Sequence, residues 1–266
     1  VASFRALQRL FSYSGTAPFL ARSWTRGDAP SVRPQGKVKW IQPGSGRERF
    51  LTDASSDEVV GDLFGLYLFF KLAASSEEKN EVRQIVSRLM RRIVKANYEL
   101  LDVDGEPTTW GRWSLEYFAT PQGKPDAALN ALELLGMLRS AIAITGEGEF
   151  EDSYADRLKS GYGALACQYR KGNSSVNHSD DQLAFLSYFV LLSESRDFPA
   201  RQELLNCFRQ LIAQVKPKEN PLFNALATVL LKESVEFDTS LRVLQQIPLD
   251  LVRWDISLTH RLDVRE

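Results

Sequence analysis

The stretch Asn177-His178-Ser179-Asp180-Asp181 decides how this chain is organised, because it lies between two apolar helical segments and begins the second one. Ser179 or Asp180 can cap the following helix through a side-chain oxygen. One residue is enough for a cap, yet five polar side chains stand here, including one of only two histidines. We therefore expect this stretch to do more than start a helix.

Outward from this stretch, two kinds of helical segment alternate along the chain. One kind is apolar on nearly every face, which is typical of a buried helix, and the other is amphipathic. Short turns follow the apolar segments and therefore predict antiparallel helical hairpins. The predicted apolar helices are 57–73, 127–144, 180–192 and 221–231, and the amphipathic ones are 2–13, 77–97, 149–169, 201–215 and 239–246.

This alternation predicts an all-α fold, an α/α toroid of helical hairpins with inner and outer helix layers. Four complete hairpins are visible, so we expect an incomplete ring within a single domain over residues 1–266. A solenoid of helix pairs is the alternative, although no fixed-period repeat is evident. At most a small β-hairpin is expected, in the loop 37–51 of the long irregular stretch 16–54.

Composition narrows the classes of partner. The net charge is −1 and the sequence pI is about 6.3, which does not favour nucleic acid or an anionic membrane as a partner. No uninterrupted apolar run has the length of roughly 18 residues that a membrane span needs. The Arg-rich face of residues 83–95 is predicted to be a solvated outer surface. The chain opens at Val1 inside a helical pattern, which indicates a processed chain or a fragment and favours an extracytoplasmic location.

The two cysteines, Cys167 and Cys207, both fall in predicted outer helices. An inner helix is expected between them, so we predict two free thiols, since a disulfide needs Cα atoms within about 7 Å. The cysteine and histidine spacing matches no metal motif, and no cofactor is predicted.

The hairpin architecture brings distant polar stretches together. If every hairpin repeats in the same way, all inner helices begin on one side of the molecule, which we call the rim. The C-terminal tail follows an outer helix and returns to the same side. Besides 177–181, the stretches expected at the rim are Ser55-Ser56-Asp57-Glu58, Trp110-Gly111-Arg112-Trp113, Asn220-Pro221-Leu222-Phe223-Asn224 and Arg253-Trp254-Asp255.

Carboxylates beside indole rings are typical of carbohydrate sites. Rings stack on the apolar face of a sugar, and acids handle protons and hydroxyl groups. The positive ends of the inner helices also stabilise carboxylates placed there.

Several of these residues also have a purely structural interpretation. Glu58 can complete a capping box, and Asp180 with Asp181 can serve as cap and dipole complement. Arg112 can pair with an acid while its flanking tryptophans anchor the loop. Glu133 falls on a predicted inner helix, so it must be paired or face a cavity.

Five motifs resemble an uncharacterised bacterial family, and that family is similar to the six-hairpin (α/α-toroid) glycosidase superfamily. The resemblance to the uncharacterised family covers roughly residues 7–264. The similarity to glycosidases concerns the fold alone. The motifs are residues 55–58, 104–114, 130–133, 177–181 and 248–252.

Together these observations predict a carbohydrate-active enzyme, a glycoside hydrolase or polysaccharide lyase, with its cleft on the rim. Asp57 and Asp181 are the expected acid pair, with Glu58, Glu133 and His178 as alternates. The residues expected to bind the substrate are Trp110, Arg112, Trp113, Asn130, Asp180, Asn224, Arg253, Trp254, Asp255 and His260.

Two other functions remain open at this point. The chain could be a non-catalytic carbohydrate-binding or accessory domain of a larger protein. It could also be a sugar epimerase-like toroid, for which His178 and His260 are the histidines available for proton transfer.

Overall fold

The computed structural model of the chain describes residues 2–11, 20–27, 37–42, 46–170, 178–194 and 201–247. Helices contain 67% of these residues and strands 9%, so the prediction of a mainly helical fold is confirmed. The helices are α1 (Ala2–Phe11), α2 (Ser56–Leu72), α3 (Ser76–Lys95), α4 (Leu115–Phe118), α5 (Ala127–Thr145), α6 (Gly148–Lys159), α7 (Tyr162–Ala166), α8 (His178–Glu194), α9 (Arg201–Val215), the 3-10 turn η1 (Lys216–Lys218), α10 (Pro221–Leu231) and α11 (Phe237–Gln246).

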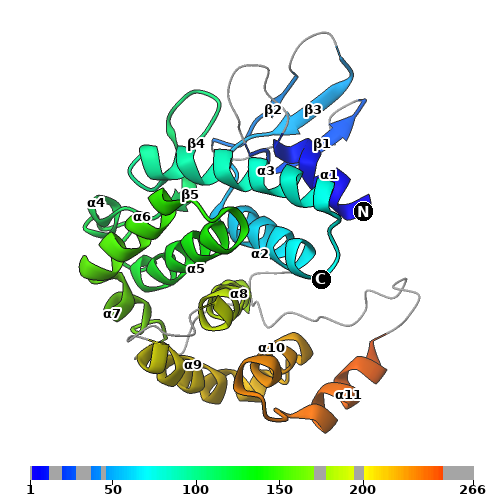
Figure 1. The fold of residues 1–266 in the computed structure, drawn as a ribbon, viewed down its shortest axis with the longest axis vertical. Coiled ribbons are helices and arrows are strands. Elements are labelled where there is room, and N and C mark those ends of the chain that lie inside the picture. The colour runs from blue at the N-terminus through cyan, green and yellow to red at the C-terminus, as the bar shows by residue number, and fades with distance from the viewer. Residues whose placement is uncertain are drawn as a thin grey trace.

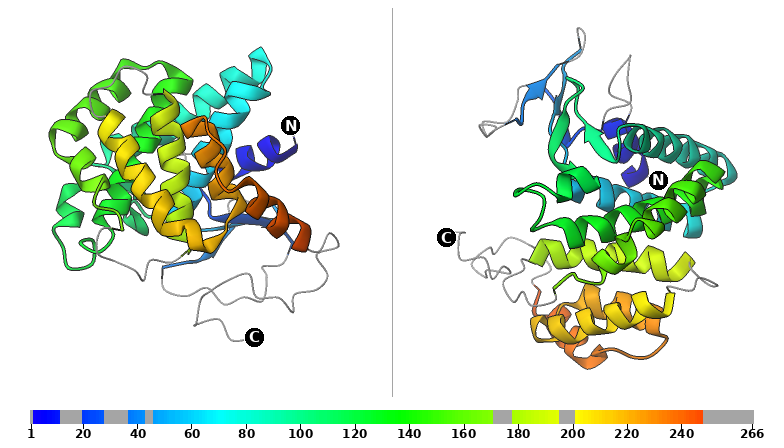
Figure 2. Two further views of the ribbon diagram at one scale, coloured as in Figure 1. Left: turned by 90° about the horizontal axis from the view of Figure 1, so that it is seen from below. Right: turned by 90° about the vertical axis from the view of Figure 1, so that its left-hand side faces the viewer.

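The apolar helices α2, α5 and α8 pack against one another, and α10 continues this inner row by packing on α8. Helix α5 is central and also contacts α3, α6 and α7, which cover it from outside (Figure 1). Gly136 lets α5 approach α8 closely, because a Cβ atom there would lie 3.0 Å from the Cα of Ser187. The series of hairpins runs from the β-strands at one end of the molecule to α11 at the other, and Figure 2 shows it from two further sides.

The ends of the inner helices follow from local sequence. Glu58 accepts a hydrogen bond of 2.5 Å from the backbone N–H of Ser55, as the predicted capping box requires. Asn220 caps α10 by accepting from the N–H of Leu222 at 2.8 Å. Gly146 ends α5 with φ of 70°, a left-handed conformation that glycine adopts without steric cost.

The predicted hairpin within 37–51 is confirmed, but the limit to this one hairpin is wrong. Strands β1 (Ser23–Arg26), β2 (Trp40–Ile41) and β3 (Glu48–Leu51) form an antiparallel sheet in the order β1-β3-β2. A second antiparallel pair joins β4 (Glu99–Leu101) and β5 (Pro107–Arg112), with Glu99 opposite Arg112. Short strands held mainly by cross-strand pairing have no strong periodic signal of their own in the sequence.

The predicted outer helix 149–169 is divided in two. Helix α6 ends at Lys159, Gly161 adopts φ of 91°, and α7 follows as a short separate helix. Both pieces pack on α5. The chain therefore changes direction near Gly161, which a continuous helix would not allow.

The prediction of two free thiols is also wrong. Cys167 and Cys207 form a disulfide, with Cα atoms 5.4 Å apart. The prediction placed Cys167 on one long outer helix, whereas Cys167 directly follows the short α7. Because the chain turns at Gly161, Cys167 reaches α9, which carries Cys207.

The last hairpin differs from the others in its burial. Within the described part of the chain, α11 has no buried residue. Its side chains Phe237, Leu241 and Leu244 are exposed, as is Val229 on α10. Contacts within this hairpin and between α10 and α8 attach it to the rest of the row.

One described helix, α5, is long and apolar enough to cross a membrane by length and composition alone. Of its most apolar 18-residue window, 78% is buried inside the protein. Helix α5 contains Glu133 and Arg139, which is why the sequence showed no uninterrupted apolar run of this length. A buried core helix passes the same test, and the central position of α5 accounts for its composition.

Candidate functional site

The beginnings of α8 and α10 lie next to each other. The Asn220 side-chain nitrogen lies 2.8 Å from Nε2 of His178. The His178 ring also stacks on Phe223, with ring centroids 5.2 Å apart. Asn224, one residue further along α10, is buried and donates to the hydroxyl of Ser240 at 2.9 Å. The start of α10 therefore holds His178 in place through a hydrogen bond and a ring contact.

Glu133 lies in the second turn of α5 and is fully enclosed, with 0% exposure. The indole Nε1 of Trp113 donates a hydrogen bond of 2.8 Å to Oε2 of Glu133. Its other oxygen, Oε1, has no hydrogen-bond partner among the described residues. The hydroxyl of Tyr162 donates to the backbone carbonyl of Trp113 at 2.6 Å and fixes the loop that holds the indole.

The pKa of Glu133 is raised to about 8, mainly because burial removes water from the carboxylate. The Trp113 hydrogen bond acts in the opposite direction, and the charges of Asp57, Asp180 and Asp126 raise the pKa further. Asp57 and Asp180 belong to the first turns of α2 and α8. The charges at the beginnings of α2 and α8 therefore act on Glu133, and Glu133 keeps its proton at neutral pH.

Asp181, at the start of α8, is equally enclosed, with 0% exposure, but its partners are different. Arg170 binds both of its carboxylate oxygens, at 2.5 and 2.8 Å. Lys218 reaches the carboxylate at 2.6 Å, and the hydroxyl of Tyr169 donates to it at 3.0 Å. The pKa of Tyr169 is raised, first by burial and then by the charge of Asp181. Two cations therefore surround one buried carboxylate.

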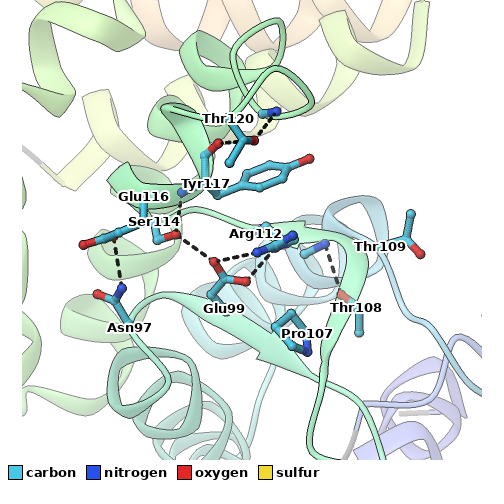
Figure 3. A network of polar contacts seen from close by, with 12 residues as sticks. Asn97, Glu99, Pro107, Thr108, Thr109, Arg112, Ser114, Glu116, Tyr117 and Thr120 are labelled. Atoms are coloured by element: carbon cyan, nitrogen blue, oxygen red, sulfur yellow. Dashed lines mark hydrogen bonds and ion pairs between the residues drawn. The ribbon is translucent and has the colours of Figure 1, made fainter.

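Arg112 is engaged by Glu99 on the neighbouring strand, as Figure 3 shows. Its Nε lies 2.6 Å from the Glu99 carboxylate, and Ser114 donates to the same carboxylate at 2.7 Å. The guanidinium also lies over the ring of Tyr117, 4.3 Å from the centroid. Asn130 donates to the backbone carbonyl of Arg112 at 2.8 Å and ties β5 to α5. Arg112 therefore pairs with an acid, as its structural interpretation predicted.

The two tryptophans of β5 and the adjoining loop have opposite environments. Trp113 is fully buried, whereas Trp110 is 54% exposed. Asp57 is exposed too, and its carboxylate accepts from the hydroxyl of Ser55 at 3.1 Å. Glu58 is used by the capping box and lies 3.4 Å from Arg22. Asp57 and Trp110 are thus the acid and the ring that a ligand can reach from solvent.

Two of the five stretches expected at the rim are in direct contact, because Asn220 of stretch 220–224 meets His178 of stretch 177–181. Stretch 110–113 contacts α5 through Trp113. Stretches 55–58 and 177–181 act on Glu133 through the charges of Asp57 and Asp180. The fifth stretch, with Arg253, Trp254 and Asp255, lies outside the described residues, as do His260 and Asn177.

The sequence analysis missed several residues near the rim. Asp53, buried with φ of 59°, accepts from the backbone N–H and the hydroxyl of Thr109 at 2.7 and 2.9 Å. Asp62 on α2 has a pKa raised to about 7 by burial and by Glu58. A charge on an otherwise apolar helix signals Asp62 as it signalled Glu133. Arg170 and Lys218 lie in connections, where no pattern marks them.

The fold and the site together define a mainly helical hairpin protein in which α2 and α8 carry acidic side chains in their first turns. In the described part of the chain, no group of three or more His, Cys, Asp or Glu side chains is placed to hold a metal ion. Comparison of the chain with models of protein families, with curated proteins and with solved structures finds no match.

Proposed function

We propose that this chain is a carbohydrate-active enzyme, of the glycoside hydrolase or polysaccharide lyase type, with its cleft on the rim. The observation that carries the proposal is the enclosed carboxyl group of Glu133 on α5, whose pKa is raised by burial and by the charges of Asp57 on α2 and Asp180 on α8. Glu133 therefore holds its proton at neutral pH.

Cleavage of a glycosidic bond uses one carboxyl group that gives a proton and a second that acts as base or nucleophile. Neighbouring carboxyl groups take these different roles when their surroundings separate their pKa values. Asp57 is exposed and can meet the substrate, and Trp110 offers an exposed ring for stacking. Glu133 is enclosed and acts as a positioning residue that holds a proton near neutral pH.

In this proposal Asp57 is the acid that meets the substrate, and Glu133, which has 0% exposure, acts on it only as a buried neighbour. Asp181 is bound by Arg170 and Lys218 and has no exposed atom through which to meet a substrate. Its role in the proposal is to fix the start of α8, and hence the position of Asp180.

The inner row and the outer helices support the finer reading of the fold as an arc of an α/α toroid, in which consecutive hairpins turn around a common axis. The Cys167–Cys207 disulfide supports an extracytoplasmic location, because such bonds persist mainly in oxidising compartments.

The proposal is tested by incubating the protein with a panel of neutral and acidic oligosaccharides, between about pH 4 and pH 9. Cleavage of at least one glycan is expected, and Asp57→Asn should lower turnover by about two orders of magnitude or more. The matched control is Asp152→Asn, because Asp152 is exposed on the outer helix α6. Absence of cleavage across the panel, with melting temperatures unchanged, would remove the enzymatic proposal.

A non-catalytic carbohydrate-binding domain is the second candidate. The observation that favours it is the complete enclosure of Glu133 and Asp181, which leaves Asp57 as the exposed one of these three acids. This candidate predicts glycan binding without bond cleavage, and binding that persists in both Asp57→Asn and Glu133→Gln. Titration calorimetry of the same panel separates the two candidates.

A further inference from the structure

A basic cleft lies on the outer side of the molecule, where the last two turns of α3 meet β4. Its volume is 420 Å³. Leu101 of β4 and Ala96 form its apolar part, and its other lining residues are the cations Arg88, Arg91, Arg92 and Lys95. The carboxyl cluster of the rim contributes no residue to this cleft.

The four cations follow the spacing i, i+3, i+4 and i+7, so they share one face of α3. Like charges at this spacing repel each other and destabilise the helix. The negative end of the helix dipole stabilises cations in this last part of α3, but only within about one turn. The arrangement therefore retains an excess of positive charge that an anion can neutralise.

Among the described residues, carboxylates pair with Arg91, and the charge of Asp102 acts on Arg92. Arg91 pairs with Glu147 at 3.0 Å and also contacts Glu149. Arg92 donates to the backbone carbonyl of Asp102 at 3.1 Å, and burial lowers its pKa.

The remaining two cations, Arg88 and Lys95, are both exposed. Arg88 donates to the carbonyl of Gln84 within its own helix at 3.2 Å. Among the described residues, neither cation forms an ion pair with a carboxylate.

We propose that this cleft is a binding site for a small molecule that carries two or more anionic oxygen groups, as phosphate, sulfate or carboxylate. Guanidinium groups bind such oxygens through paired N–H donors, and lysine adds a point charge. The four cations extend over roughly 10 Å along the helix axis, which matches a compact ligand rather than a long polymer. The lining contains no aromatic side chain on which a nucleic acid base could stack.

The site goes beyond the proposed carbohydrate function and does not depend on it. The test is titration calorimetry of the full chain with inorganic tripolyphosphate and, in a second arm, with a trisulfated disaccharide. The double variant Arg88→Gln/Lys95→Gln should weaken the binding of the preferred probe at least about tenfold, because two charge-assisted contacts are lost. The arm that binds more tightly identifies the source of the anionic groups.

The matched control is Lys159→Gln/Arg209→Gln, which removes the same two charges from the exposed surfaces of α6 and α9. Its affinity should stay within about twofold of the wild type, since distant exposed charges contribute little. The proposal is overturned if neither probe binds, or if both double variants lose affinity equally. It is also overturned if a short single-stranded oligonucleotide binds more tightly than either probe and this binding requires Arg88 and Lys95.

Discussion

Glu133 on α5 and Asp181 on α8 form an instructive pair, because both are carboxyl groups near the start of adjacent inner helices. Both have 0% exposure. Asp181 is surrounded by Arg170, Lys218 and the hydroxyl of Tyr169. Glu133 receives one hydrogen bond, from Trp113, and has one oxygen without a partner among the described residues.

The difference shows that equal burial leads to different chemistry. Removing a carboxylate from water is costly unless cations and hydrogen bonds replace the water. At Asp181 two cations do so, and the group acts as a structural anion. At Glu133 no cation does so within the described chain, so the carboxyl group retains its proton, which its raised pKa expresses.

The largest expected effect is that of Asp181→Asn. This variant should lower the free energy of unfolding by about 3–5 kcal/mol, because it removes the carboxylate from a buried ion cluster. The Arg170 side chain is only 6% exposed and cannot turn to water without disrupting its surroundings. Urea denaturation measures the loss. The control Asp152→Asn should change stability by less than about 0.5 kcal/mol, and a similarly small change for Asp181→Asn would contradict the ion-cluster interpretation.

The disulfide provides a second way to test the Asp181 side of the comparison. Cys167 precedes Tyr169 and Arg170 by two and three residues, so its bond to Cys207 restrains the segment that supplies these partners. The double variant Cys167→Ser/Cys207→Ser should lose about 2–4 kcal/mol of stability. Thermal unfolding with and without reductant measures the effect. A wild-type protein that unfolds at the same temperature in both conditions would argue against the restraint.

Glu133→Gln tests the other side of the comparison through the dependence of stability on pH. The folded-state pKa of about 8 exceeds the ordinary value of 4.5, so the folded protein holds a proton that the unfolded chain releases. Wild-type stability should therefore fall as pH rises between these values, by about 1.4 kcal/mol per pH unit from this group. Glutamine cannot ionise, so from pH 5 to 7 the variant should gain about 2–3 kcal/mol relative to wild type.

The pH measurement needs a difference between two proteins, because other groups contribute slopes of their own. Asp62, with its pKa raised to about 7, adds a slope of the same sign to both wild type and variant. Subtracting the two stability curves cancels that contribution. Curves that stay parallel from pH 5 to 7 would show that Glu133 is ionised in the folded protein.

The smallest expected change in stability is that of Asp57→Asn. Asp57 is exposed in the first turn of α2, and asparagine suits that position about as well as aspartate. The free energy of unfolding should change by no more than about 1 kcal/mol. Parallel measurement of melting temperature and glycan turnover isolates the role of the carboxylate. A large loss of stability would mean that Asp57, too, belongs to a structural charge network.

Much of the helical framework was predictable from the sequence. The predicted helices 57–73 and 127–144 correspond to α2 and α5 within about one residue. Both are apolar on every face and have strong boundary signals, a capping box before α2 and Gly146 after α5. These signals are local, so they do not require knowledge of the tertiary structure.

The remaining features depend on contacts between distant residues. The pairing of Glu99 with Arg112 defines β4 and β5 only once the chain folds back on itself. The disulfide requires the change of direction at Gly161, which one glycine in a helical pattern does not specify. At the site, Glu133 was predictable as a charge on an apolar helix. The cations beside Asp181 were not, because Arg170 and Lys218 lie in irregular connections.

The central position of α5 and the peripheral position of α11 have a consequence for amide hydrogen exchange. Exchange of a backbone amide requires local or global opening, and its free energy reflects the burial of the cooperative unit to which it belongs. Helix α5 packs against five other helices, whereas α11 packs on α10 alone among its main contacts. The amides of α5 should therefore exchange only on global unfolding, and those of α11 through separate opening of the last hairpin. Mass spectrometry of deuterium uptake would then show protection that falls along the row from α5 through α8 and α10 to α11.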